Sequence, residues 1–480
     1  MAELRPNRRQ LLRGIAGFAA TPIVARGGAQ PPARPVFDPW PQAEEIRSRI
    51  VPPRFPQRDF VVTKYGARPD GKTDGTEAFR RAIGECAASG GGRVLVPEGQ
   101  FLTGAIHLHS GVNLHLAAGA TVLFSRDPRA YLPVVFTRWE GVECMNYSPF
   151  VYADGQQNIA ITGSGTLDGQ ASCSHWWPWK GRQDCGWKPG QPSQQRARDR
   201  LVQMGEQDVP VEQRVFGEGA CLRPQFIQPH RCRNVLIQGV TLVNSPMWEI
   251  HPVLCRNVTV RNVTVSSHGP NNDGCDPESC SDVLIEGCRF DTGDDCIAIK
   301  SGRNRDGRRV NVAAENLVIR GCEMKDGHGG VTIGSEVSGN VRNVFAEDCR
   351  MHSPNLERAL RIKTNAVRGG AIENIFMRNV KVGQVSDAVI HVDFYYEEGA
   401  AGQHLPVVRN IQVQGVTCAK SKYALYLRAF EQAPLTDVTV EQCTFDNVQQ
   451  PNRIEHVRNL RLREVRINGE RVSTAAATGG

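Results

Sequence analysis

The sequence lacks any apolar run near the length of about 20 residues that a membrane-spanning helix requires. It also lacks a Cys-x-x-Cys pair of the kind that binds zinc, although it contains 15 cysteines. A strong excess of charge of one sign is missing as well, once the N-terminus is set aside. These absences argue against a membrane protein, a structural zinc site and a nucleic-acid-binding protein.

Most of the positive charge lies at the N-terminus. The formal net charge is +7, but residues 1–28 carry five arginines and one glutamate, which leaves 52 basic and 49 acidic residues and a net charge of +3. A chain this balanced does not attract an acidic ligand by its overall charge. Such a ligand would have to be bound by a local group of basic side chains.

The two ends of the chain are expected to lie outside the fold. Arg8 and Arg9 precede a leucine pair and a mildly apolar stretch with small residues, an order similar to that of a twin-arginine signal peptide over residues 1–28. We therefore expect export, to the periplasm or by secretion. The proline-rich residues 29–57 predict an extended lead-in, and residues 473–480 predict a disordered tail.

One sequence unit recurs along most of the chain. Each copy begins with Asn or Asp, alternates apolar and polar residues, turns, and alternates again; the copies begin at Asn158, Asn234, Asn257, Asp282, Asn316, Asn343, Asn374, Asn410, Asp437 and Asn459. Alternation with a period of two indicates strands with one buried face, and units this short stack as a solenoid. The predicted fold is all-β: a single-stranded right-handed parallel β-helix over residues 58–472, with the first residue of each unit capping a turn and stacking on its neighbours.

A helix is predicted before the repeats, where it would cover the open end of the solenoid. Asp74 and Glu77 can cap this helix, and its apolar stripe consists of Ala78, Phe79, Ala82, Ile83 and Cys86.

The cysteines fit the same repeat. Six residues after each start from Asn234 onward, the residue is either cysteine or valine, as at Cys288, Cys322 and Val380, so cysteine acts there as a small core residue. We expect mostly free, buried thiols. Cys173 and Cys185 lie in a loop-like stretch, and the sequence leaves open whether they are bonded.

Counting from the repeat starts brings reactive side chains together. Asp294 is twelve residues after Asp282, and His328 is twelve residues after Asn316, so these two side chains should stack about 4.8 Å apart on successive coils. Asp295 is adjacent, and Asp273 lies on the preceding coil.

The following coil adds two cations to this group. Arg361 and Lys363 are two residues apart on a predicted strand and therefore share a face. Crowded carboxylates raise one another's pKa, so one of them can stay protonated beside an ionised one, as cleavage of a glycosidic bond requires. The cations suit a sugar that carries a carboxylate.

Four blocks in this region resemble the signature blocks of family 28 glycoside hydrolases, the polygalacturonases, and they occur in the family's order: NND at 271–273, GDDCIAIKSG at 293–302, GHGGVTIGSE at 327–336 and RIK at 361–363. The resemblance extends from about residue 58 to 470 and implies a pectin-lyase-like solenoid. The first block departs from the family at Asn272, where threonine is usual.

The resemblance implies roles for the residues of these blocks. Asp294 would be the general acid, Asp273 and Asp295 would hold and activate water in an inverting hydrolysis, and His328 would support the acid. Arg361 and Lys363 would bind the galacturonate carboxylate. Further substrate-binding residues are expected at Lys300, Asn272 and, in the YYEEG stretch, Tyr396.

An aromatic insertion at about residues 170–225 bears on where the substrate is cut. Trp176 and Trp177 could stack on sugar rings there, or anchor a long loop as a small satellite core. The surrounding sequence is similar to that of bacterial exo-acting polygalacturonases, which implies hydrolysis of α-1,4-galacturonosidic bonds from a chain end with release of galacturonate.

Several alternatives remain at this stage. They are an endo-polygalacturonase, a rhamnogalacturonan galacturonohydrolase, a calcium-dependent pectate lyase and a non-catalytic polysaccharide-binding β-helix. Aspartates also bind calcium, so the aspartate group alone does not exclude the lyase. The expected partner is an acidic polysaccharide, and we expect no cofactor, catalytic metal, nucleic acid or membrane.

Overall fold

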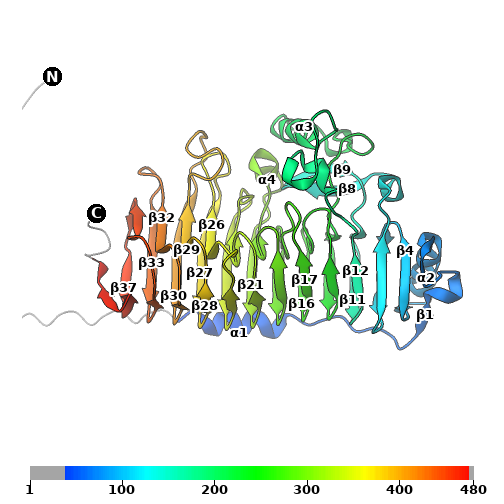
Figure 1. Ribbon diagram of the computed structural model, residues 1–480, viewed down its shortest axis with the longest axis horizontal. Helices are drawn as coiled ribbons and strands as arrows, with labels where there is room; N and C mark the ends of the chain where they lie inside the picture. Colours follow the sequence, from blue (N-terminus) through cyan, green and yellow to red (C-terminus); the bar gives the residue numbers. More distant parts are fainter. Residues whose placement is uncertain (1–37, 475–480) are drawn as a thin grey trace, which may run out of the picture. The chain divides into compact units, whose positions relative to one another are not determined.

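The computed structural model describes residues 38–474. The chain separates into a unit that ends at Asp38 and a unit Pro39–Gly480, and every described helix and strand belongs to the second unit. That unit is a parallel β-helix whose coils stack side by side (Figure 1), as predicted. Among the described helices, none is long and apolar enough to span a membrane. The predicted signal peptide and most of the predicted tail lie outside the described residues.

Two long sheets form two sides of the β-helix, and nearly all of their strand pairs are parallel. The first sheet consists of β1 (Asp59–Val61), β3 (Gly92–Val96), β6 (Val112–Leu116), β11 (Gln157–Gly163), β14 (Arg233–Gln238), β16 (Arg256–Arg261), β18 (Ser281–Glu286), β21 (Ala314–Arg320), β24 (Val341–Glu347), β27 (Ala371–Arg378), β30 (Val407–Gln414), β33 (Leu435–Glu441), β36 (Val457–Arg458) and β37 (Arg461–Arg463). The second consists of β2 (Asp70–Asp74), β4 (Gly99–Thr103), β7 (Ala120–Phe124), β12 (Thr166–Asp168), β15 (Thr241–Val243), β17 (Thr264–Ser267), β19 (Arg289–Thr292), β22 (Glu323–Met324), β25 (Arg350–His352), β28 (Lys381–Gln384), β31 (Thr417–Cys418), β34 (Thr444–Phe445), β38 (Val465–Ile467) and β39 (Glu470–Val472).

The third side is divided into two sheets. One contains β5 (Ile106–His107), β10 (Val151–Asp154) and β13 (Ile227–His230); the other contains β20 (Ile297–Ile299), β23 (Val331–Ile333), β26 (Arg358–Lys363), β29 (Ala388–Asp393), β32 (Tyr423–Arg428) and β35 (Arg453–Glu455). Between them, single bridges at Ile250 and Cys275 continue the pairing to Ile297. This side therefore has its least regular backbone at the coils that carry Asp273.

The Asn or Asp that begins each repeat has a backbone reason to be there. All ten of these residues have φ between 54° and 61°, the left-handed region in which Asn and Asp are the best tolerated residues after glycine. Their side chains also form the predicted stack: Asn343 Nδ2 donates to Asn316 Oδ1 at 3.1 Å, and Asn374 Nδ2 donates to Asn343 Oδ1 at 3.0 Å. Each repeat therefore turns at a fixed point, which sets the register of the coils.

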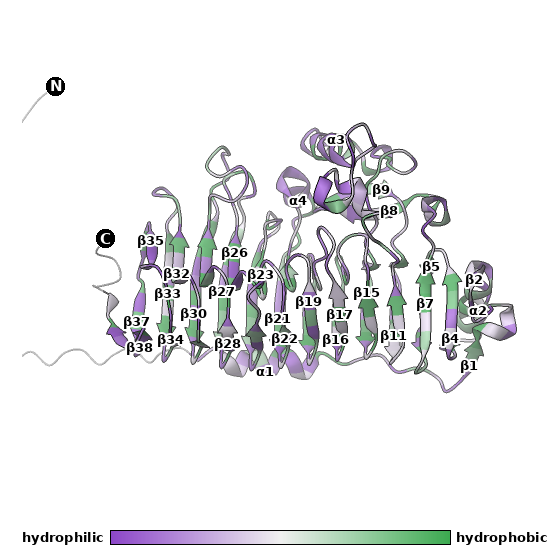
Figure 2. Ribbon diagram, in the orientation of Figure 1, coloured by the Kyte–Doolittle hydropathy of each residue, from purple (hydrophilic) through white to green (hydrophobic). Residues whose placement is uncertain are grey.

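The strands bury alternate residues in one long core, and apolar and polar residues alternate along them in Figure 2. From the repeat at Asn234 onward, the residues six positions after each start are all buried, including Cys288, Cys322, Cys349 and Cys443. All 15 cysteines are free thiols, and Cys173 is the exposed one among them. The prediction of free core cysteines is confirmed.

The predicted capping helix is α2 (Thr76–Ala88), which buries the predicted stripe of Ala78, Phe79, Ala82, Ile83 and Cys86. Its capping differs from the prediction. The cap position is Gly75, and the Asp74 carboxylate accepts from the Thr76 N–H at 2.9 Å, whereas Glu77 pairs with Arg80 one turn along.

The proline-rich lead-in was predicted to be extended, and this prediction is wrong for residues 40–49. They form α1 (Trp40–Arg49), which starts at a proline and packs on the outer face of the first sheet. Trp40, Ala43, Ile46 and Ile50 cover four outward-facing apolar residues on successive strands: Leu284, Val318, Phe345 and Phe376. The helix forms because these four residues would otherwise expose an apolar stripe to water.

The insertion and two other segments of the chain build a cover over the middle coils. The hairpin β8 (Val135–Trp139) and β9 (Val142–Asn146) lies with α3 (Gln195–Glu206) and α4 (Asn304–Val310) above the third side (Figure 1). A separate apolar cluster holds this cover together, formed by Trp139, Val142, Cys144, Leu201, Phe216, Leu222, Met247 and Trp248.

Candidate active site

The predicted acidic residues lie in the turns that join the second side of the β-helix to the third. Asp294 and Asp295 lie between β19 and β20, and His328 lies between β22 and β23. Backbone hydrogen bonds fix the relation between coils: the His328 N–H donates to the Asp294 carbonyl at 3.1 Å, and the Gly274 N–H donates to the Asp295 carbonyl at 2.9 Å. Residues from three coils are thus brought to one place.

Asp294 and His328 form the pair that the register predicted. His328 Nδ1 lies 2.9 Å from Asp294 Oδ1, and about half of the His328 side chain remains exposed. The hydrogen bond to Asp294 raises the pKa of His328 to about 9. Burial alone would raise the pKa of Asp294, but the bond from His328 outweighs it, and the pKa of Asp294 lies below its ordinary value. The pair therefore holds one proton near neutral pH.

Asp295 is fully buried, and two cationic side chains pair with its carboxylate. Lys363 Nζ lies 2.7 Å from Oδ2, and the Arg361 guanidinium lies 3.1 Å from Oδ1, where the Thr332 hydroxyl also donates at 2.9 Å. Burial acts to raise the pKa of Asp295, but Lys363 and Arg361 outweigh it and hold the pKa well below its usual range. Asp295 is therefore ionised near neutral pH.

Asp273 differs from Asp294 and Asp295 in that its pKa is raised. It is buried, and burial together with the nearby Asp294 raises its pKa to about 7. Behind it, Lys300 Nζ lies 3.4 Å from both Asp273 and Asp276 and 3.6 Å from Glu336. With a pKa of about 7, Asp273 is partly ionised near neutral pH in the unbound protein, whereas Asp294 shares the proton of His328.

A cavity of about 280 Å³ opens onto Asp294 and His328. The repeats form one wall of it, and the insertion forms the other with Trp177, Lys180 and Arg182. Trp177 is held in place by a hydrogen bond from its indole nitrogen to the Ser245 carbonyl at 2.9 Å. The cavity has the size of a small-ligand site and is mostly polar, as a sugar requires.

Three of the predicted substrate-binding residues are too buried to contact a ligand, so these predictions are wrong. Lys300 is 2% exposed and neutralises carboxylates. Asn272 is completely buried, because its side-chain amide joins the backbone carbonyls of Ser245 and Met247 at 3.1 Å each. Trp176 packs in the core against Tyr131 and Phe150, as in the alternative interpretation of a satellite core.

The remaining predicted binding residues lie at the site. Trp177 lines the cavity, and the Tyr396 ring lies 5.2 Å from Lys363 Nζ and 5.7 Å from the Arg361 guanidinium. Tyr395 instead packs against Phe430 and Arg428, which supports the choice of Tyr396. In this structure Arg361 and Lys363 pair with Asp295, so their contact with a substrate carboxylate stays a prediction.

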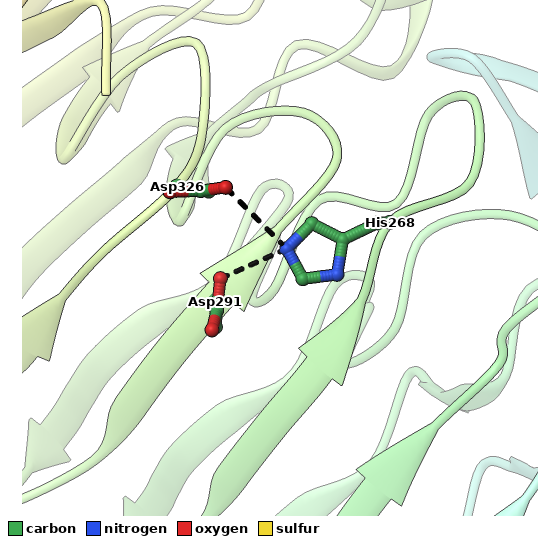
Figure 3. Close-up of side chains that lie close together, drawn as sticks. All are labelled: His268, Asp291 and Asp326. Atoms are coloured by element: carbon green, nitrogen blue, oxygen red, sulfur yellow. Dashed lines mark hydrogen bonds and ion pairs between the residues drawn. The ribbon is translucent and has the colours of Figure 1, made fainter. Parts of the chain in front are cut away.

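Two groups of side chains among the described residues have the spacing of metal ligands. Asp273, Asp294 and Asp295 offer oxygens within 4.8 Å of one another, but each of them already faces a cation of the protein. The other group is His268, Asp291 and Asp326 (Figure 3), in which His268 Nε2 lies 2.8 Å from Asp291 and 3.8 Å from Asp326. His268 also lines the cavity. Both groups are explained by internal pairing.

Sequence reasoning missed several residues of the site. Asp276, three residues after Asp273, is buried beside it, and Glu249 lies buried nearby. Lys180 comes from the insertion and faces the same cavity as Asp294. The block NNDGCD gave a signal for Asp276 through its second aspartate, but no pattern in the sequence pointed to Lys180.

An acid–histidine pair, a carboxyl group of raised pKa and an ionised carboxylate, grouped at a polar cavity on a parallel β-helix, define an enzyme that cleaves glycosidic bonds by acid–base catalysis. The comparisons agree. Residues 216–464 match Glycosyl hydrolases family 28, and the chain belongs to this family.

Individual relatives carry the comparison further. The crystal structure of a hyperthermoactive exopolygalacturonase from Thermotoga maritima is 49% identical, with a TM-score of 0.86, over 90% of this chain and 96% of that one. A family 28 exopolygalacturonase from Yersinia enterocolitica shares the fold at 21% identity, with a TM-score of 0.68, over 87% of this chain and 76% of that one. A probable polygalacturonase from Vitis vinifera is 29% identical over 80% of this chain and 73% of its own.

Proposed function

We propose that this protein is an exo-acting polygalacturonase, which hydrolyses α-1,4-galacturonosidic bonds at a chain end of polygalacturonate and releases galacturonate. The observation that carries the proposal is the Asp294–His328 pair, which faces a cavity closed on one side by the insertion. The likeness to the Thermotoga maritima exopolygalacturonase also supports the proposal, since it extends over 90% of the chain at 49% identity.

Asp294 supplies the proton in the proposed reaction. The proton held by the Asp294–His328 pair passes from Asp294 to the glycosidic oxygen as the bond from C1 to that oxygen breaks. Asp294 lines the cavity, and it is the member of the pair that lies close to the carboxylates of Asp273 and Asp295. His328 then restores the proton because it remains partly open to water.

Asp273 and Asp295 act on the water in this proposal. Asp273, with a pKa of about 7, accepts one proton of the water while the oxygen of that water bonds to C1. Asp295 orients the water and stabilises the positive charge that develops on the sugar. Inverting glycosidases usually hold their two carboxyl groups about 6.5–9.5 Å apart. Here the nearest oxygens of all three carboxylates lie within 4.8 Å, so we place the water beside the Asp273–Asp295 pair. Proton NMR of the first product tests this step, because inversion of an α-linkage yields the β-anomer.

The test of the function is the product pattern from polygalacturonate in the presence of EDTA. We expect galacturonate as the sole early product, slow loss of viscosity and no absorbance from unsaturated uronides, because the insertion closes the cavity beyond a terminal sugar. A protein with Asp294→Asn, prepared in the same way, serves as the control. A ladder of saturated oligomers would indicate endo action, and unsaturated or calcium-dependent products would indicate a lyase.

The activity should depend on the proton of the Asp294–His328 pair. This proton is present below the pKa of His328, about 9, and is lost above it, so we expect kcat/KM to fall as the pH rises through about 9. In His328→Gln the cation is gone and Asp294 must hold the proton by itself, so this fall should move to a pH at least one unit lower. An unchanged alkaline limb in His328→Gln would contradict the proposed pairing.

A further inference from the structure

Lys180 projects from the insertion into the cavity that contains the proposed acid. It ends the short 3-10 helix Trp177–Lys180, and it lines the cavity together with Asp294, His328 and Asn271. Its Nζ donates to Asn271 Oδ1 at 2.8 Å. Within residues 38–474, no carboxylate oxygen lies within 4.0 Å of this ammonium group, so it has no ion-pair partner.

A second cation supports the same amide. The Arg223 guanidinium is completely buried, and it donates to Asn271 Oδ1 at 2.8 Å, to the carbonyls of Pro246 and Pro270 at 2.7 Å each, and to Gln194 Oε1 at 2.9 Å. All of these acceptors are uncharged. Two cations thus converge on a single amide oxygen, and among the described residues neither of them forms an ion pair with a carboxylate.

The other basic side chains around the cavity already have partners among the described residues. Arg182 pairs with Asp184, His268 with Asp291 at 2.8 Å (Figure 3), and His328 with Asp294 at 2.9 Å. Deeper in the site, Arg361 and Lys363 pair with Asp295. Lys180 is therefore the cation of this cavity that is available for an incoming anion.

A buried cation without a counter-ion is unfavourable unless a ligand supplies the negative charge. Burial lowers the pKa of Arg223 to about 10 and also lowers that of Lys180, and it outweighs the opposite effect of the Glu140 and Asp294 carboxylates. The unfavourable energy is relieved when an anion enters, and that anion is then bound by charge-assisted hydrogen bonds.

We propose that Lys180, backed by Asn271 and Arg223, binds the carboxylate of the terminal sugar and makes the enzyme select a chain end that is not esterified. This inference rests on the proposed function and names the residue that determines its specificity. It assigns carboxylate recognition at the closed end of the cavity to the insertion, separately from Arg361 and Lys363 of the repeats.

The experiment compares Lys180→Met with wild type on trigalacturonate and on its methyl ester. We expect kcat/KM for trigalacturonate to fall by ~10–100-fold, as for the loss of one hydrogen bond to a charged group. For the methyl ester we expect a change of less than ~3-fold, because no carboxylate is present. Lys188→Met is the matched control: Lys188 is an exposed lysine of the same insertion, and both substrates should be cleaved as by wild type.

Binding and folding measurements keep the result interpretable. Calorimetry should show weaker binding of galacturonate to Lys180→Met and equal binding of its methyl ester, and the thermal midpoint should match that of wild type. Equal losses on both substrates, or no loss on trigalacturonate, would overturn the assignment of Lys180. If wild type itself releases no galacturonate from polygalacturonate, the proposed function fails, and that result is distinct from a failure at Lys180.

Discussion

Replacing Asp294 by asparagine should lower kcat by ~10³–10⁴-fold, near the upper end of what a general acid contributes. Asparagine has the same shape and can still accept a hydrogen bond from His328 through its oxygen, so the turn between β19 and β20 should keep its conformation. KM should stay within a few fold of the wild-type value because the cavity is unchanged. Steady-state kinetics on trigalacturonate, with thermal unfolding as the test of folding, measures both effects.

Asp291→Asn is the matched control for this prediction. Asp291 lies three residues earlier at the end of β19, is partly buried and pairs with a histidine, His268, as Asp294 pairs with His328. Its pair is displaced from the three grouped carboxylates, so kcat should change less than ~3-fold, the usual scale for a surface substitution. Equal losses in the two variants would mean that any disturbed Asp–His pair inactivates the enzyme, and Asp294 would lose its assigned role.

The fold could be predicted because the repeat signal has a local physical cause. Each unit needs a residue that tolerates a positive φ at one corner, and Asn343 or Asp282 provides it while the amides stack between coils. Once the corners are fixed, counting residues gives the register, and the register predicts that Asp294 meets His328. The active carboxylates were therefore accessible from the sequence through backbone conformation.

The first error concerns what covers the solenoid. Phe345 and Phe376 stand at positions where other repeats have a polar residue, such as Gln412, and this departure predicts a covered outer face. It could have identified α1, but the prolines around residues 39–41 favoured an extended chain. A pattern within one segment does not reveal that a distant segment will pack on it.

The second error concerns burial within the site. Lys300 lies in the same signature block as Asp294 and Asp295, and the resemblance therefore implied a contact with substrate, yet its side chain is buried and meets Asp276. The two neighbouring tryptophans also differ in burial: Trp176 lies in the core, and Trp177 lines the cavity. A difference of one residue changes the direction of a side chain in an irregular loop, and no periodicity specifies that direction.

Replacing Lys300 by methionine should destabilise the fold by ~3–5 kcal/mol, the usual effect of removing one partner of a buried ion pair. The ammonium group lies 3.4 Å from Asp273 and from Asp276 and 3.6 Å from Glu336, and it lies 4.4 Å from the centre of the Trp248 ring. Methionine can replace the stem but not the charge. The midpoint of denaturant unfolding should therefore fall well below that of wild type at pH 8.

The loss of stability in Lys300→Met should be smaller at low pH, because the pKa of Asp276 is raised in the folded protein. Burial and the nearby Asp273 already raise the pKa of Asp276 well above its ordinary value, and loss of Lys300 raises it further. A carboxyl group whose pKa is higher in the folded state stabilises that state when protonated, and this contribution is lost as the pH rises above the unfolded pKa of about 4. We expect the difference from wild type to shrink between pH 8 and pH 5.

Lys325→Met is the control for the stability measurement. Lys325 is 56% exposed and lies 4.0 Å from Asp291, so the loss of this contact should change the unfolding free energy by no more than ~0.5 kcal/mol at either pH. A Lys300→Met protein as stable as wild type at pH 8 would mean that Asp273 and Asp276 are neutral there without Lys300. Asp273 would then carry a proton at the pH of reaction and could not accept one from water, so the same measurement tests its assignment as the base.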